Sequence, residues 1–108
     1  MKAIVYHQQN RDKMFEASIG AFDMKDFQPV AEVDCSKAHS SGVAPVVNAL
    51  LEYAYLKTNS IDGYWGDNKE VKDLTGENRS TSVGDVIEVE GVKHMVGSFG
   101  FQELQSYP

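Results

Sequence analysis

The stretch that decides the fold is RSTSVGDVIEVEGVKHMVGSFGFQEL, residues Arg79–Leu104. In its first half, Ile87 and Val89 alternate with charged residues, which is the two-residue period of a strand with one buried face. A second run rich in apolar residues begins at Val92. The sequence therefore predicts a β-hairpin, against which the rest of the chain packs.

The turn of this hairpin is predicted at Glu90-Gly91, because glycine accepts the positive φ that a two-residue turn requires. This turn fixes the register, and a slip of one residue would expose Ile87. The predicted cross-strand pairs are Val89 with Val92, Glu88 with Lys93, Ile87 with His94 and Val86 with Met95. Further on, Gly97 and Gly100 interrupt the return strand and predict a bulge or a sharp bend.

Four more segments have a recognisable pattern. Lys2–His7 and Phe27–Asp34 alternate in the manner of strands, and Met14–Met24 is interpreted as a short strand. Val43–Lys57 carries apolar residues at helical spacing and predicts one amphipathic helix. The following segment, Asn59–Asn78, lacks periodicity and is predicted to be a long loop.

These elements predict a single α+β domain over residues 1–108. Its core would be an antiparallel sheet of four to five strands, covered on one face by the single long helix. Gly84, Gly97 and Gly100 favour a sheet that is curled and partly closed.

Composition limits the possible functions. The net charge of −6 argues against direct nucleic-acid binding, and no apolar run is long enough to span a membrane. With Cys35 as the only cysteine, the chain fits a reducing compartment, and we expect a cytoplasmic protein. Between Ser60 and Glu90, the sequence contains eight acidic and three basic residues. This excess predicts either a solvated acidic face or a surface that imitates DNA or meets a basic partner.

The residues give little support to catalysis. Cys35 and His39 could form a nucleophile and its base, or half of a metal site completed by His7 and His94. The spacing of these residues does not match a structural zinc site, however, and His94 falls on the predicted core face. We therefore expect a protein that is not an enzyme and that holds no metal or cofactor.

The predicted binding surface is the loop after the helix together with the approach to the hairpin. Its candidate residues are Asn59, Asp62, Trp65, Asn68 and Arg79. They combine aromatic, amide, carboxylate and guanidinium groups, as adaptable protein contacts do. Each also has a structural interpretation: Trp65 could pack on the hairpin, and Arg79 could pair with a nearby carboxylate.

Four stretches carry a family resemblance: Val30–Asp34, Leu51–Asn68, Arg79–Gly91 and Ser98–Phe101. Their order resembles a family of small uncharacterised proteins from phages and other mobile elements. The closing segment looks like the YodL-like module of larger mobile-element proteins, some associated with antirestriction. The resemblance implies an accessory protein, which we expect to act by protein binding. The alternatives are an acidic DNA mimic or antirestriction-type inhibitor, and a small enzyme, perhaps hydrolytic.

Overall fold

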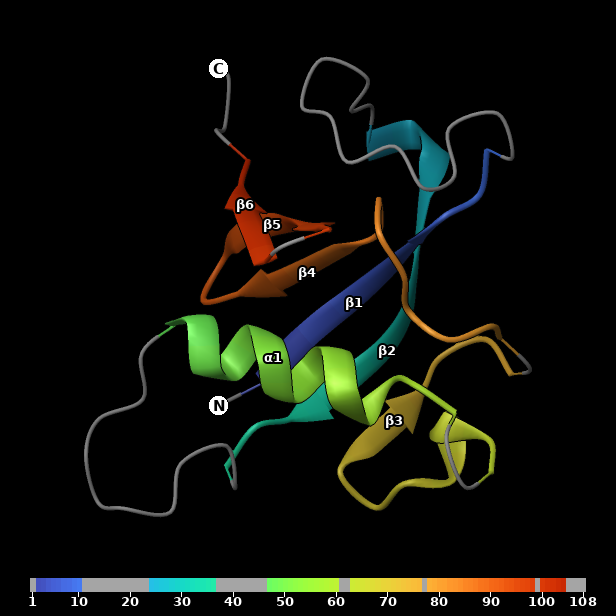
Figure 1. Cartoon of the computed structure of the whole chain (residues 1–108). Helices are drawn as coiled ribbons and strands as arrows, with labels where there is room; N and C mark the ends of the chain where they lie inside the picture. Colours follow the sequence, from blue (N-terminus) through green and yellow to red (C-terminus); the bar gives the residue numbers. More distant parts are fainter. Residues whose placement is uncertain are drawn as a thin grey trace.

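The computed structural model describes residues 2–10, 24–36, 47–60, 63–76, 78–98 and 100–104. Within these ranges, a six-stranded antiparallel sheet carries one α-helix across one of its faces (Figure 1). The strand order is β3-β2-β1-β4-β5-β6, so β1 and β4 are the central strands. The elements in chain order are β1 (Lys2–Gln8), η3 (Met24–Asp26), β2 (Phe27–Asp34), α1 (Val47–Lys57), η4 (Trp65–Asp67), β3 (Val71–Asp73), β4 (Val86–Val89), β5 (Val92–Gly97) and β6 (Gly100–Glu103).

The predicted α+β architecture and the predicted hairpin are confirmed. Strands β4 and β5 pair in the expected register at all four positions, from Val86 with Met95 to Val89 with Val92. At the turn, Glu90 has a φ of 53° and Gly91 a φ of 79°, the two positive values that a tight two-residue hairpin turn uses. The side-chain period and one dipeptide therefore determine this register.

The glycine-marked bend is a second tight hairpin. Gly97 pairs with Gly100, and the chain reverses between β5 and β6. Gly100 has a φ of 137°, and a Cβ on Gly97 would lie 3.2 Å from the carbonyl oxygen of Gly100. Both positions therefore favour glycine. Phe99, which lies between them in the sequence, is outside the described residues.

The strand count and the partial closure were predicted wrongly. Strand β3 pairs with residues 31–33 of β2, although it falls inside the segment predicted to be a loop. With β3 and β6 the sheet has six strands, and these two strands form its open edges. The predicted strand Met14–Met24 lies outside the described residues except for Met24, which begins η3.

Helix α1 packs against β4 and β1 on one face of the sheet (Figure 1). The predicted helix began at Val43, but residues 43–46 lie outside the described ranges. Leu50, Leu51 and Ala54 are buried, as the helical spacing predicts. Leu56 is 56% exposed, because the apolar face of α1 is wider than the strip that reaches the sheet.

The core has two parts. The larger cluster lies between α1 and the sheet and includes Leu50 and Ile87. A smaller cluster contains Phe27, Val86, Met95 and Leu104. Because Val86 and Ile87 are neighbours in a strand, their side chains point to opposite faces. The prediction that the hairpin buries one face was therefore incomplete.

No helix in the described ranges is long and apolar enough to cross a membrane.

Candidate functional site

A pocket of about 420 Å³ lies where the chain leaves α1 and enters η4. We call it the loop pocket, and it is lined by Leu56, Lys57, Asn59, Gly63, Tyr64, Trp65, Asp67 and Asn68. Three of the five predicted binding residues therefore meet at one hollow. Asp62 lies outside the described residues, and Arg79 does not line the pocket.

Trp65 is a core residue with one surface at the loop pocket. It is 1% exposed, and its indole Nε1 donates a hydrogen bond of 2.9 Å to the backbone oxygen of Arg79. Its ring meets His7 edge-on at a centroid distance of 6.3 Å and lies 5.1 Å from the ring of Tyr64. The hypothesis of an exposed aromatic anchor is therefore wrong for Trp65. The side chain is packed in the core, with ring contacts to His7 of β1 and to Tyr64, whereas the packing interpretation placed it on the hairpin.

Asn59 and Asn68 are held by the end of α1. The Nδ2 group of Asn59 donates to the backbone oxygen of Tyr55, and that of Asn68 donates to Lys57 at 2.9 Å. The last carbonyls of a helix have no partner within the helix, so these amides satisfy them. Both side chains are half-buried and oriented, which presents a fixed polar wall to the loop pocket.

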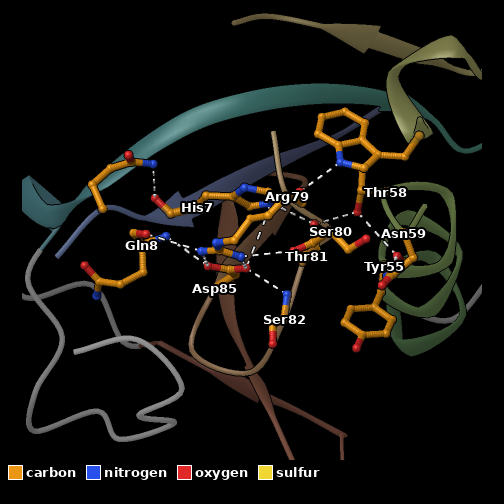
Figure 2. A network of polar contacts seen from close by, with 12 residues as sticks. His7, Gln8, Tyr55, Thr58, Asn59, Arg79, Ser80, Thr81, Ser82 and Asp85 are labelled. Carbon is orange, nitrogen blue, oxygen red and sulfur yellow. Dashed lines mark hydrogen bonds and ion pairs between the residues drawn. The ribbon is translucent and has the colours of Figure 1, made fainter. Parts of the chain in front are cut away.

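Arg79 belongs to a buried ion pair instead of a contact surface (Figure 2). Its Nη1 and Nη2 atoms donate to the two carboxylate oxygens of Asp85 at 2.6 and 2.8 Å. The backbone amides of Gln8 and Ser82 donate to the same carboxylate at 2.9 and 2.8 Å. The hydrogen bonds from Arg79 to Asp85 raise the pKa of the guanidinium. The interpretation that Arg79 pairs with a local carboxylate is therefore confirmed.

A chain of buried hydrogen bonds lies beside this ion pair (Figure 2). Thr81 donates its hydroxyl proton to Thr58 at 2.7 Å, and Thr58 donates to the backbone oxygen of Ala54 at 2.8 Å. The hydroxyl of Thr81 is 2.9 Å from Nε2 of His7. Since the proton of Thr81 is already donated, we assign Nε2–H of His7 as the donor to Thr81. In this tautomer, Nε2 cannot accept the proton of Thr81.

His7 is fixed in its neutral form by burial. Its side chain is 2% exposed, and burial lowers its pKa from 6.5 to about 4. The negative charge of Asp85, 3.9 Å away, opposes this effect, while the positive charge of Arg79 adds to it. The His7–Thr81 pair is buried away from solvent. Nε2 of His7 carries a proton, so it cannot act as the base that would activate the Thr81 hydroxyl as a nucleophile. Alternation along β1 places His7 on the face of Val5, but that pattern gave no sign of the chain of hydrogen bonds.

The candidate thiol of Cys35 is also buried. Cys35 is 1% exposed, its Sγ donates to the backbone oxygen of Val33 at 3.6 Å, and burial raises its pKa. A raised thiol pKa reduces the thiolate that would react at neutral pH. His39 lies outside the described residues. Among the residues that the structure describes, no group of three His, Cys, Asp or Glu could hold a metal ion.

Several acids of the middle third have partners within the fold. Asp85 is paired with Arg79, and Glu88 lies 3.3 Å from Lys93, which confirms the predicted cross-strand pair. Asp73 accepts a hydrogen bond of 2.8 Å from the hydroxyl of Tyr64. Asp62 and Glu77, two of the eight acids, lie outside the described residues, and the DNA-mimic alternative stays a prediction.

Comparison with models of known protein families gives no match, and neither curated proteins nor solved structures provide one. The resemblance to the mobile-element family therefore stays a prediction. What the chain does has to be argued from the geometry of its surface.

Proposed function

We propose that the chain is a small accessory protein, of the type carried by phages and mobile elements, that binds another protein through the loop pocket. The observation that carries this proposal is the position of the exposed side chain of Leu56 beside a hollow of about 420 Å³. A concave site with apolar walls and a few oriented polar groups is the usual form of a binding site.

The wall chemistry fits an extended peptide segment. An apolar side chain of the partner would bury Leu56 and contact Tyr64, removing apolar surface from water. The oriented amides of Asn59 and Asn68 can meet backbone groups of the same segment. In this arrangement, the apolar contact provides most of the affinity for the peptide segment, and the amides fix the orientation of the segment.

Binding is favoured over catalysis because two ionisable groups of the pocket are already engaged. The hydroxyl of Tyr64 donates to Asp73 and accepts from the backbone amide of Asn78. Burial and, after it, the hydrogen bond to Asp73 raise the pKa of Tyr64. The Nζ atom of Lys57 lies 5.5 Å from the ring centre of Tyr53. These contacts are structural, and they leave Asp67 as the remaining ionisable group of the pocket; a single carboxylate does not make the acid–base pair that general catalysis uses.

The test compares two exposed leucines. Leu56→Glu places a charge at the rim of the loop pocket, and Leu74→Glu places the same charge on a side chain that is 38% exposed and does not line it. Both tagged variants would be incubated with host lysate beside the wild type, after circular dichroism has shown that they are folded. We expect Leu56→Glu to lose a protein that the wild type and Leu74→Glu both retain. Equal capture by all three would reject the loop pocket as the binding site.

A further inference from the structure

A second hollow lies at the other end of α1, between the first turn of the helix, the β4–β5 turn and the end of β6. It has a volume of about 170 Å³. We call it the valine cleft, and its lining residues are Val47, Val89, Glu90, Val92, His94 and Glu103. It shares no residue with the loop pocket, so conclusions about it do not depend on the proposed function.

The walls of the valine cleft are apolar and open to solvent. Val47 and Val92 are 42% and 40% exposed, whereas Val89 is buried at 2%. A ligand with a hydrocarbon stem would cover the two exposed valines and gain the free energy of removing their surface from water. The aliphatic walls therefore select a ligand that is partly apolar.

The polar groups of the cleft are hydrogen-bond acceptors. Glu90 and Glu103 are exposed carboxylates. His94 is only 7% exposed, and its Nδ1 lies 3.2 Å from the backbone oxygen of Val92. A carbonyl oxygen can only accept, so Nδ1 carries a proton, and a ring that is protonated on Nδ1 alone has an acceptor at Nε2.

The Nε2 atom of His94 is accessible from the valine cleft. Nε2 of His94 has no hydrogen-bond partner among the described residues. Every fully buried side-chain nitrogen or oxygen of the described residues does have a partner, so Nε2 is not fully buried. Nε2 must therefore reach open space, and the space that His94 lines is the valine cleft. A side chain that is more than nine-tenths buried thus offers a free acceptor to the cleft.

These acceptors do not form a metal site, since no described group of three His, Cys, Asp or Glu could hold an ion. They suit a larger, donor-only cation with several N–H groups. The arginine guanidinium has five N–H donors and no acceptor, and it ends a stem of methylene groups. Its stem matches the valine walls, and its head matches two carboxylates and an imidazole nitrogen.

We propose that the valine cleft binds an arginine side chain of a protein partner, with the stem between Val47 and Val92 and the guanidinium among Glu90, Glu103 and Nε2 of His94. The net charge of −6 attracts a basic partner from a distance. Free arginine fits less well, because its own carboxylate would approach the two acidic side chains of the rim.

The probe is N-acetyl-arginine amide, titrated into ¹⁵N-labelled protein and followed by amide chemical shifts. N-acetyl-citrulline amide has nearly the same shape without the charge and serves as the matched control ligand. We expect the arginine probe to shift the amides of Val92, His94 and Glu103, and the citrulline probe to leave them in place. Equal shifts with both probes, or no shifts with the arginine probe, would overturn the proposal.

Two double variants separate specific binding from general charge attraction. Glu90→Gln with Glu103→Gln removes two charges from the valine cleft, while Glu52→Gln with Asp34→Asn removes two exposed charges from outside both the valine cleft and the loop pocket. The first pair should weaken the arginine probe about threefold to tenfold, and the second should change its affinity by less than about twofold. Equal weakening by both would reduce the interaction to unspecific attraction and overturn the site. Tighter binding of free arginine than of the capped probe would overturn the assignment to a protein partner.

Discussion

Asp85 and Glu103 are both carboxylates of the sheet region, but their surroundings are opposite. Asp85 is 1% exposed, and four N–H groups from Arg79, Gln8 and Ser82 saturate its two oxygens. Glu103 is exposed at the rim of the valine cleft, and no described residue pairs with it. The buried group stabilises the fold, whereas the exposed group is available to a ligand. Saturation by internal donors thus distinguishes a structural charge from a binding charge.

The largest effect is expected at the saturated carboxylate. Asp85→Ala leaves the guanidinium of Arg79 without its partner and two backbone amides without an acceptor. Breaking a buried pair in this way costs about 3–5 kcal/mol, and we expect the lower part of this range because the side chain of Arg79 is 33% exposed. Urea unfolding measures the loss. A loss below about 1 kcal/mol would contradict the structural role of Asp85.

An intermediate effect is expected from acidification, through His7. Its pKa is about 4 in the folded protein and 6.5 in its ordinary state, so protons bind more tightly to the unfolded chain. Stability is therefore expected to fall as the pH decreases from about 6.5 to about 4, by up to about 3 kcal/mol. Urea unfolding at a series of pH values measures this slope.

The control is His7→Gln, which does not titrate and can still donate to Thr81 through its amide. Its stability should change less than that of the wild type between pH 6.5 and 4. Parallel curves for the two proteins would assign the acid sensitivity to carboxylates elsewhere and contradict the burial of a neutral His7.

The smallest effect is expected at the valine cleft. Glu103→Gln removes an exposed charge from a chain with a net charge of −6 and breaks no described contact. We expect the free energy of unfolding to change by less than about 0.5 kcal/mol, with a slight gain because mutual repulsion decreases. Thermal unfolding of this variant beside Asp85→Ala sharpens the comparison. A loss as large as that of Asp85→Ala would show that Glu103 is also structural.

The sequence predicted the regular parts of the fold because they depend on local patterns. The alternation through Ile87 and Val89, together with the turn at Glu90-Gly91, was sufficient for the hairpin register. Strand β2 was predicted with its correct ends at Phe27 and Asp34. Strand β3 has three residues, of which only Val71 is buried, so it is too short to show a period.

The candidate site was predicted only in outline, because burial depends on partners far along the chain. Arg79 resembles a contact residue in the sequence, yet it also donates to the backbone oxygen of Gln8, 71 positions away. In the sequence, Trp65 suits either a contact anchor or a packed aromatic, and the fold places it against His7. Conversely, Leu56 widens the apolar face of the predicted helix, and only the packing of α1 shows that its side chain is exposed. Residue type selected three residues that line one pocket, Asn59, Trp65 and Asn68, and tertiary contacts show how each side chain is held.

The central position of β1 has a consequence for folding during synthesis. Strand β2 follows β1 closely in the chain and can pair with it early, whereas β4 holds the other side of β1. The hydrogen bond from Tyr6 to Glu88 spans 82 positions, so this edge stays unpaired until most of the chain has left the ribosome. An open strand edge invites pairing with other chains. During synthesis from the N-terminus, the free edge of β1 in the β1–β2 pair is therefore exposed until β4 has been made. We expect nascent chains that stall before β4 to aggregate most and to bind chaperones most.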